Sequence, residues 1–424
     1  MSAEGRTEYV TCLGCGCGCD DVTVTVNQGR IVAAAPLCPV GKAWFGDGRV
    51  PEEVLSEGRP ATLDQALANA AAALVRPKGR RLVYLGLDLN SQAQRAGLAI
   101  ADLLGASVDC ATSETAAGGL MTFQRRGRAG ATLGEIRNRG DAFLFWGVDP
   151  SHRYPRFLSR YGLEPVGTHV PEGRRGRDVI GVSVGADQAL ADVDLMLELE
   201  PGEEITALSI MRASVLGHEL PVSSPLAARA VEIAGRLARA RYAILVHDAE
   251  PTEEARNPLR AEALVALALA LNGPTRSALC SLRAGGNRVG AEAVLTSQTG
   301  YPFAVDYSRG YPRYVPGERG LSAVISGGFT AALVAGSPLL DPSALSALSA
   351  IGTVAIGPRA SEAQFTTRVA IDTGVAGIHE AGTAYRMDEV PLTLRTPLAG
   401  PRSATEVLVA LHEALRSELQ GGRR

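Results

Sequence analysis

Apolar and polar residues change their pattern along the chain near residue 60. Before that point, residues 22–26 alternate apolar and polar side chains, residues 27–30 contain a glycine turn, and residues 31–33 are again apolar. Alternation with a period of two around a glycine turn is typical of a β-hairpin. The first part of the chain is therefore predicted to be a small β-rich unit.

Beyond residue 60, short apolar runs alternate with longer stretches rich in alanine and leucine. The first of these stretches is predicted to be a helix that begins after Thr62, whose hydroxyl can cap it. Apolar strands separated by helices indicate parallel sheets that are covered on both faces. The predicted strands are residues 81–87, 142–147, 179–184, 242–246, 331–335 and 352–356, and the predicted helices include 93–104, 225–240 and 260–271.

Loops with glycine and proline follow three of these strands, at residues 147–150, 336–338 and 357–359. Ligands of parallel sheets bind at the carboxyl ends of the strands, so each loop is a candidate for a ligand site. Glycine and proline also make simple turns, and this alternative stays open for each loop.

The composition is that of an ordinary globular protein, with 46% hydrophobic and 21% charged residues in a chain of 424. That length is enough for two or three domains. The net charge is −3 and no basic face is evident, so nucleic acid is not an expected partner. The sequence has no apolar signal core and no run of ~18 apolar residues. We therefore expect a cytoplasmic protein that does not contact a membrane.

Five of the seven cysteines lie close together near the N-terminus, and clustered thiols in a reducing compartment point to a metal. The spacing suits a [4Fe–4S] cluster or a structural zinc ion. A glycine-rich loop with free thiols is the alternative. The four candidate ligands are Cys12, Cys15, Cys19 and Cys38, with Cys17 as an additional thiol.

Outside the cysteine cluster, few residues are candidates for catalysis or for binding a ligand. Lys42 follows Cys38 by four residues, and its charge would offset the negative charge of a thiolate-bound cluster. The six histidines lack the spacing of metal ligands. His247 follows a predicted strand and could lie in a cleft, although a structural histidine with its hydrogen bonds satisfied is the simpler interpretation. The sequence contains neither a serine nucleophile elbow nor a phosphate-binding loop.

The N-terminal motif Cys-x2-Cys-x3-Cys-Asp-Asp, followed by a hairpin and Cys-x2-Gly-Lys, resembles the start of the molybdopterin oxidoreductases. Four further segments narrow the resemblance to the B subunit of tungsten or molybdenum formylmethanofuran dehydrogenase. These are residues 146–150 (WGVDP), 154–161 (YPRFLSRY), 298–314 (QTGYPFAVDYSRGYPRY) and 380–388 (EAGTAYRMD).

The resemblance implies an α/β fold class. It consists of a small β-rich N-terminal cysteine-motif domain and two parallel-sheet, Rossmann-like α/β domains, as in domains 1–3 of the formate dehydrogenases. We expect these domains at residues 1–58, at 59–145 together with 325–424, and at 146–324.

The resemblance also implies a bis-pterin tungsten or molybdenum ion that is ligated by a cysteine or selenocysteine. In this chain the Cys-His pair of the family aligns near Thr115 and Ala116. Threonine cannot replace a soft thiolate ligand, so Thr115 marks a degenerate redox-metal position. Cys110 is the nearest thiol, and we expect it to be a small buried side chain.

Two more positions depart from the family. Residues 337–340 read Ser-Pro-Leu-Leu, where the family carries polar pterin contacts and a histidine. Asp149 stands where an amide is usual, and its carboxylate would repel the pyrophosphates of a pterin cofactor. Together with Thr115, these departures resemble the B subunit of the bacterial formyltransferase/hydrolase complex. That complex moves a formyl group from a tetrahydromethanopterin carrier to a methanofuran-type carrier and releases formate.

We therefore expect a non-redox scaffold subunit without molybdopterin or tungsten, in which the four cysteines hold a [4Fe–4S] cluster or a zinc ion if they retain a metal. Its expected partners are hydrolase-type A and C subunits and a formyltransferase-type D subunit, with a methanofuran-type carrier bound within the complex. Arg309 and Arg313 are candidates for contacting the polyanionic carrier or a partner, or else they pair internally. The alternative function is an active tungsten or molybdenum dehydrogenase subunit whose [4Fe–4S] cluster relays electrons.

Overall fold

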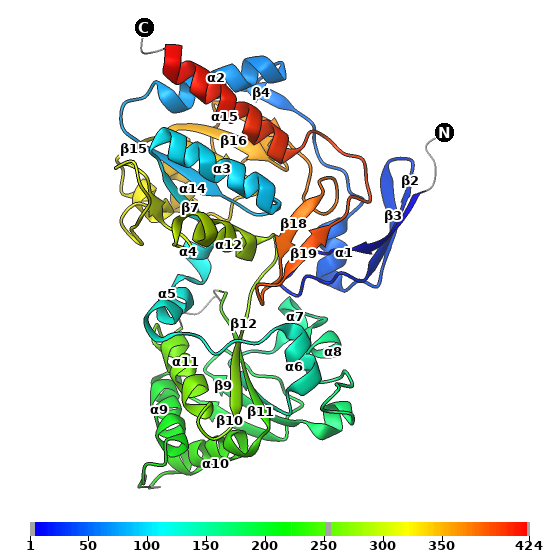
Figure 1. The fold of residues 1–424 in the computed structure, drawn as a ribbon, viewed down its shortest axis with the longest axis vertical. Coiled ribbons are helices and arrows are strands. Elements are labelled where there is room, and N and C mark those ends of the chain that lie inside the picture. Colours follow the sequence, from blue (N-terminus) through cyan, green and yellow to red (C-terminus); the bar gives the residue numbers. More distant parts are fainter. Residues whose placement is uncertain (1–4, 222, 251–255, 422–424) are drawn as a thin grey trace. The chain divides into compact units, whose positions relative to one another are not determined.

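The computed structural model describes residues 5–221, 223–250 and 256–421, which form two compact units. The first unit combines Met1–Glu114 with Gly285–Arg424, and the second is Thr115–Ala284. The second unit is therefore a continuous insertion into the first, coloured from cyan to yellow-green in Figure 1.

The first unit is built on a mixed sheet in the order β14-β13-β7-β6-β15-β16-β17-β4-β5, whose five central strands run parallel. From β6 the chain adds β7 on one side, and it later adds β15, β16 and β17 on the other side. The direction in which strands are added therefore reverses between β6 and β15. The bounds are β4 Val54–Ser56, β5 Arg59–Pro60, β6 Arg80–Leu85, β7 Ser107–Cys110, β13 Val305–Asp306, β14 Arg313–Tyr314, β15 Phe329–Ala335, β16 Gly352–Gly357 and β17 Val369–Asp372.

Helices cover both faces of this sheet. α2, α3 and α15 pack together and α12 packs on α3, whereas α13 and α14 contribute to a hydrophobic cluster with Leu82 and Tyr84 of β6 (Figure 1). The predicted cap of α2 is confirmed, because Thr62 and Gln65 form a reciprocal capping box. The bounds are α2 Leu63–Val75, α3 Ser91–Leu104, α4 Thr112–Thr115, α12 Arg288–Thr299, α13 Leu321–Ile325, α14 Pro342–Ser349 and α15 Ala404–Gly421.

Two small antiparallel sheets and a short helix complete the first unit. The predicted N-terminal hairpin is confirmed as β2 and β3, and β1 pairs with β2 on its other side. A second hairpin, β18–β19, comes from the C-terminal part of the chain. The bounds are β1 Gly5–Val10, β2 Val22–Asn27, β3 Arg30–Ala35, α1 Pro39–Phe45, β18 Gly382–Tyr385 and β19 Pro391–Leu394.

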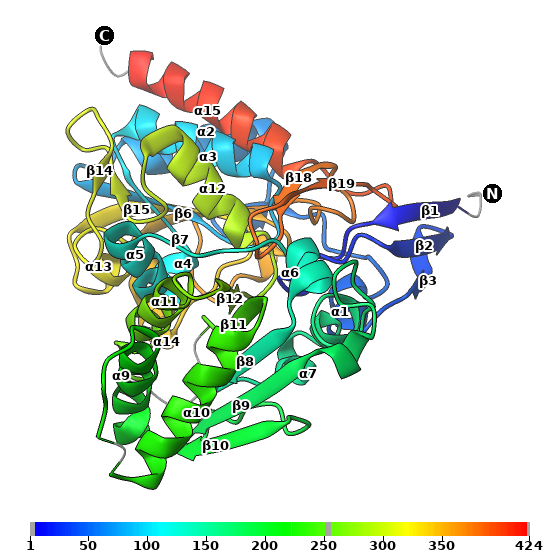
Figure 2. The same cartoon turned by 60° about the horizontal axis from the view of Figure 1, so that its bottom comes forward.

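The second unit has a five-stranded, fully parallel sheet in the order β10-β9-β8-β11-β12. Its order of connection reverses between β8 and β11. Helices α9, α10 and α11 lie together on one face (Figure 2). The bounds are α5 Ala117–Arg126, α6 Leu133–Arg139, β8 Ala142–Trp146, α7 Pro150–Arg153, α8 Phe157–Arg160, β9 Asp178–Val184, β10 Leu195–Leu199, α9 Glu204–Val215, α10 Pro225–Arg239, β11 Tyr242–Asp248, α11 Arg260–Leu271 and β12 Arg276–Leu282.

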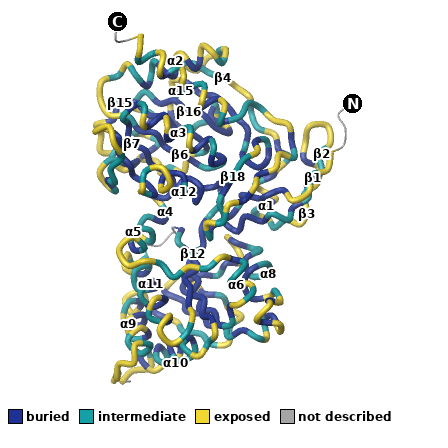
Figure 3. The backbone as a smooth tube through the Cα atoms, viewed as in Figure 1, coloured by how far each residue is buried: buried dark blue, intermediate teal, exposed yellow. Residues whose placement is uncertain are grey.

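The continuous apolar runs of the sequence become the central strands of each unit. Every residue of β8 and of β11 is buried, which is why these strands show no alternation of polar and apolar side chains (Figure 3). The predicted α/β fold class is confirmed, with a small β-rich N-terminal part and two parallel sheets. Among the described residues, no helix is long and apolar enough to cross a membrane.

The two units have boundaries that differ from the predicted domains. The predicted boundaries fall at residues 146 and 324, whereas the units divide at residues 115 and 285. β8 pairs with β9 and β11, so residues 115–145 lie with the second sheet. β13 pairs with β7 and α12 packs on α3, so residues 285–324 lie with the first. A separate domain at residues 1–58 stays a prediction.

Candidate metal centre

Four of the five clustered cysteines occupy one closed loop between β1 and β2. The N–H of Cys12 donates to the carbonyl of Cys19 at 2.8 Å, and the N–H of Gly18 donates to the carbonyl of Cys15 at 3.3 Å. The loop therefore curls back on itself. Cys12, Cys15, Cys17 and Cys19 are all buried.

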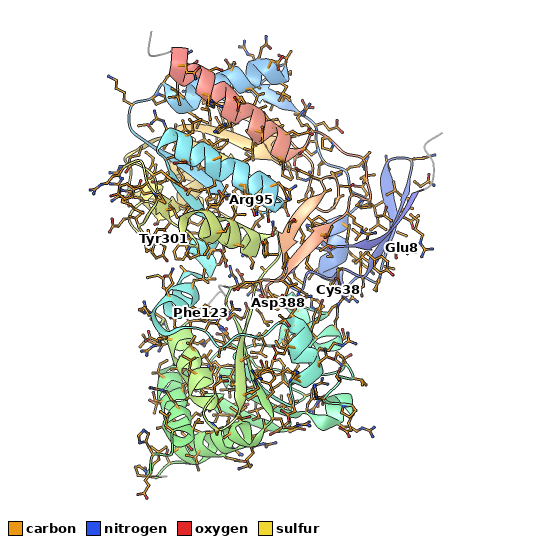
Figure 4. The ribbon with its side chains drawn as sticks, in the orientation of Figure 1. Glu8, Cys38, Arg95, Phe123, Tyr301 and Asp388 are labelled. Atoms are coloured by element: carbon orange, nitrogen blue, oxygen red, sulfur yellow. The ribbon has the colours of Figure 1, made fainter. Side chains whose placement is uncertain are left out.

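Cys38 reaches this loop from the start of α1 (Figure 4). It is the N-cap residue, and its Sγ accepts a hydrogen bond from the N–H of Gly41 at 3.4 Å. A methyl group placed on Gly41 would lie 3.3 Å from Cys12 Sγ and 3.8 Å from Cys38 Sγ. The two sulfur atoms thus lie against the same glycine.

The environment of these thiols favours their neutral form. Burial raises the pKa of Cys12 far above its usual value, and the nearby Cys15, Cys19 and Cys38 raise it further. A thiol in such a place gives up its proton only to a cation that replaces it, which is how cysteine binds a metal. Cys17, the additional thiol of the loop, is fully buried as well.

Segments far along the chain form the walls of the cysteine loop. Thr11 Oγ1 donates to the carbonyl of Thr393 at 3.1 Å, and the N–H of Met387 donates to the carbonyl of Gly16 at 3.0 Å. Asp388, labelled in Figure 4, holds the turn of this β18–β19 hairpin by pairing with Arg386. Leu13 packs in a small hydrophobic cluster with Ala376, Ala384 and Leu394.

The loop before α12 forms the remaining wall. The N–H of Gly286 donates to the carbonyl of Leu13 at 2.9 Å. A Cβ on Gly285 would lie 1.9 Å from that same oxygen, so only glycine fits there. The cysteine loop is thus enclosed by α1, the β18–β19 hairpin and the loop that leads into α12.

The sulfur atoms of Cys12, Cys15, Cys19 and Cys38 are the type of ligand that binds an iron–sulfur cluster or a zinc ion. Four buried or half-buried sulfurs come from two segments, and their charges would act on one another. Within residues 5–221, 223–250 and 256–421, however, no three His, Cys, Asp or Glu side chains are arranged as a ready-made ligand set. The side chain of Lys42 is exposed, although its N–H donates to the Cys38 carbonyl at 2.9 Å. The ligand roles and the role of Lys42 stay predictions.

Thr115 and the thiol nearest to it in sequence belong to different units. Thr115 ends α4 and lines a cavity of about 170 Å³ in the second unit. Cys110 ends β7 in the first unit, is 1% exposed, and directs its Sγ to the carbonyl of Pro302. It is the small buried side chain that the sequence predicts.

The carboxyl ends of β6 and β15 close against each other. Leu87 and Ser337 exchange two backbone hydrogen bonds, at 2.7 and 3.0 Å. A Cβ on Gly336 would lie 2.4 Å from the Leu87 carbonyl, so this contact also requires glycine. This backbone bridge lies at the point where the strand order reverses, which is where such sheets bind ligands, and Ser337 also lines a cavity of about 330 Å³ there.

The remaining predicted residues serve local structure. Asp149 Oδ1 accepts a hydrogen bond from the N–H of Ser151 at 2.9 Å and so caps α7. Arg313 pairs with Asp306, which is buried, and Arg319 joins them at 3.3 Å. Arg309 lies exposed at the tip of the same β13–β14 hairpin. Arg313 is therefore paired internally, whereas Arg309 forms no ion pair among the residues that the structure describes.

A network of charges in the second unit was not foreseen from the sequence. Arg260 contacts both Asp187 and Glu204, and Glu204 accepts from the indole N–H of Trp146 at 2.7 Å. Arg256 pairs with Asp187 at 2.9 Å. His247, buried as expected, lies 2.8 Å from the hydroxyl of Ser281 through its Nε2. These groups gather at the carboxyl ends of β8, β9 and β11.

The chain is similar in sequence to known proteins over most of its length. No family model matches the chain. It is 31% identical over 410 residues to the B subunit of the tungsten-containing formylmethanofuran dehydrogenase 2 of Methanocaldococcus jannaschii, covering 92% of this chain and 94% of that protein. The protein of the same name from Methanococcus maripaludis is 29% identical over 412 residues, with the same coverage of 92% and 94%.

The fold is shared with a solved structure of a multi-subunit complex. A chain of the formyltransferase/hydrolase complex from Methylorubrum extorquens, solved with methylofuran, superposes with a TM-score of 0.72. The two chains are 24% identical, and the superposition covers 87% of this chain and 99% of that one.

Proposed function

Since this chain belongs to the family of formylmethanofuran dehydrogenase B subunits, we propose that it is the B subunit of a formyltransferase/hydrolase complex and performs no redox step. In that role it supports the subunits that transfer the formyl group and hydrolyse it to formate. The observation that carries the proposal is Thr115, which stands where a dehydrogenase subunit needs a thiolate.

In the dehydrogenase family the resemblance implies a cysteine or selenocysteine ligand to the tungsten or molybdenum ion, and a threonine hydroxyl is not a thiolate of that kind. Cys110 cannot take over this role without leaving its place. It is packed at the end of β7, its Sγ contacts the Pro302 carbonyl, and burial keeps it a neutral thiol by raising its pKa. No other cysteine lies between Cys38 and Cys280.

The loops at the carboxyl ends of the strands also support a subunit without a pterin cofactor. At the reversal point of the first sheet, residues 337–340 contain three apolar residues and no histidine. In the second unit Asp149 places a carboxylate at the start of α7. A negative charge there opposes the binding of pyrophosphate groups.

The partners that this proposal requires are hydrolase-type and formyltransferase-type subunits, and the fold shared over 99% of the solved subunit supports such an assembly. A methanofuran-type carrier would be bound within the complex. Arg309 is the better placed of the two candidate arginines to contact it, because Arg313 is engaged by Asp306.

Cys12, Cys15, Cys19 and Cys38 would hold a [4Fe–4S] cluster in this subunit. Such a cluster supplies electron transfer in redox proteins. In a non-redox subunit the same four residues would serve to join the N-terminal loop to the start of α1.

The alternative is an active dehydrogenase subunit with the cluster as an electron relay. The observation in its favour is the 31% identity to a tungsten-containing enzyme over 92% of the chain. The two functions differ in one measurable respect, which is whether tungsten or molybdenum is bound.

The test is elemental analysis of the anaerobically purified native complex for Fe, Zn, W and Mo, together with assays for formyl transfer and for dehydrogenase activity. We expect about four Fe per chain, no W or Mo, and formyl transfer without dehydrogenase activity. Stoichiometric W or Mo would overturn the proposal and favour the alternative. Zinc alone, with formyl transfer intact, would retain the scaffold role and remove the cluster.

A further inference from the structure

The second unit has a cavity at the amino ends of its strands, opposite to the charge network at the carboxyl ends of β8, β9 and β11. This charged cavity has a volume of about 930 Å³ and lies where β8 and β9 begin and the green helix α10 ends (Figure 1). Ala142, Asp178 and Arg239 are among its lining residues. Ligands of parallel sheets usually bind at the carboxyl ends of the strands, so the cavity is not at the usual ligand position.

The lining of the charged cavity differs from that of a pocket for a small molecule. Such pockets are lined mostly by apolar and aromatic side chains. Nine of the twelve residues that line the charged cavity are arginine or aspartate, and the other three are alanine or glycine. Arginine is enriched at protein–protein interfaces, whose rims are polar. The lining therefore favours a protein partner over a small molecule.

Arg177 holds one wall of the charged cavity in place. Its side chain is 3% exposed and donates hydrogen bonds of 2.6–3.1 Å to the backbone carbonyls of Arg137, Gly140, Leu163 and Pro165. These bonds fix the segment that carries the arginines of residues 174–177. A partner that binds a rigid surface loses less conformational entropy than one that must order a flexible loop.

Three of the four lining aspartates are paired with arginines. The pairs are Arg174–Asp194, Arg236–Asp178 and Arg241–Asp141. Arg174 and Arg236 each contact both oxygens of their carboxylate, which fixes the geometry of the pair. The charges within each pair cancel, so the pairs shape the cavity without favouring an acidic or a basic partner.

The remaining charges of the cavity are mostly positive. Arg175 and Arg239 are exposed, and neither forms an ion pair or a side-chain hydrogen bond within the described parts of the chain. Arg177 contacts only carbonyls and adds a third positive charge. Asp192 is the one lining aspartate without an arginine partner among the described residues. Three such arginines against one aspartate favour an acidic partner.

From these observations we propose that the charged cavity is the docking site for an acidic segment of another protein subunit, whose carboxylates pair with Arg175 and Arg239. This inference rests on the proposed function, because it requires the chain to be part of a complex. An extended acidic segment can place single carboxylates beside the two arginines. A compact polyanion fits less well, since it brings its whole charge close to the four aspartates.

The test reverses these two charges without removing a contact of the described chain. The cavity variant combines Arg175→Glu with Arg239→Glu, and a second variant combines Arg175→Gln with Arg239→Gln. The neutral glutamines avoid placing a negative charge at the end of α10, which could weaken the helix. The matched control combines Arg59→Glu with Arg95→Glu. These two arginines are exposed, belong to the first unit and form no ion pair among the described residues, so the net charge changes equally.

The measurement is the ratio of each partner subunit to this chain in the affinity-purified native complex, determined by mass spectrometry after washing with increasing concentrations of NaCl. We expect the glutamate variant of the cavity to bind one partner subunit at least about tenfold more weakly than the wild type, because like charges then face each other. The glutamine variant should weaken the same subunit less. The control should retain it as the wild type does.

Equal subunit ratios in all four proteins at every salt concentration would overturn the proposal and leave the proposed function intact. A wild-type chain that retains no partner subunit would contradict both. A cavity variant that keeps its subunits but loses the bound carrier would also overturn the proposal, in favour of a carrier anion. Loss of self-association alone would overturn it in favour of a second copy of this chain.

Discussion

His379 Nε2 lies 2.7 Å from the carbonyl oxygen of Gly48, and this contact ties the loop after α1 to the loop after β17. The other ring nitrogen, Nδ1, accepts a hydrogen bond from the N–H of Val375 at 3.1 Å. The imidazole is therefore neutral, with its proton on Nε2. Burial lowers the pKa of His379, in keeping with this neutral form.

This arrangement predicts a dependence of stability on pH. The folded protein binds the His379 proton less readily than the unfolded chain, whose histidine pKa is about 6.5. The stability due to neutral His379 is thus complete above that pH and is lost as the pH falls below it, by up to about 1.4 kcal/mol per pH unit. His379→Gln should flatten the slope of unfolding free energy against pH below about 6.5, measured by urea denaturation. His152→Gln, at an exposed position, should leave it unchanged, and equal slopes for all three proteins would contradict the assignment.

Replacing single cysteines should distinguish those that bind iron from those that do not. Cys12→Ser should remove most of the iron from the purified chain, because Cys12 lies among the other three candidate ligands. Cys17→Ser should keep the iron content, since Cys17 stands outside the four predicted ligands. Iron analysis and visible absorption of the anaerobic protein measure both. Loss of iron in Cys17→Ser alone would mean that the ligand set includes Cys17 in place of one of the four.

The two arginines of the β13–β14 hairpin should differ in their effects. Arg313→Ala leaves the buried carboxylate of Asp306 with one fewer cation and should cost about 2–4 kcal/mol of unfolding free energy. Arg309→Ala should change stability by less than about 0.5 kcal/mol, because the side chain is exposed. If Arg309 contacts the carrier, its replacement should lower the carrier content of the purified complex. Unchanged carrier content would remove Arg309 from the binding role.

The buried charges of the second unit should be sensitive to the loss of Glu204. This carboxylate is 1% exposed and accepts from Trp146 while pairing with Arg260. Glu204→Leu leaves both donors buried without it, and we expect a loss of about 3–5 kcal/mol. Glu204→Gln keeps an acceptor for the indole and should cost about 1–3 kcal/mol. Denaturant unfolding measures both, and equal effects of the two variants would contradict the role of the charge.

Much of the fold was predictable because buried parallel strands leave a plain signal. The strands near residues 142–147 and 242–246 are apolar at every position, and the structure places them at the centre of one sheet. The cap at Thr62 was predictable for a similar reason, since its partner Gln65 lies three residues away. Local signals of this kind need no knowledge of distant segments.

The rest depends on contacts that no local pattern contains. Periodicity identifies residues 142–147 as a strand but cannot assign it to one of two sheets, so the boundaries of the units were not foreseen. The β18–β19 hairpin is short and partly polar, and its place beside the cysteine loop rests on contacts such as that between Thr11 and Thr393. The sequence allowed that His247 could lie in a cleft, but the residues of α5 and α11 that line its cavity meet only in the fold.

The walls of the cysteine loop have a consequence for the order of events during synthesis. The thiols leave the ribosome first, but the hairpin that encloses them follows more than 350 residues later. Translation adds about 5–20 residues each second, so the thiols wait tens of seconds for their enclosure. The second unit is continuous in sequence and can fold during that interval. Loading of any metal into a finished site therefore takes place after most of the polypeptide has been made.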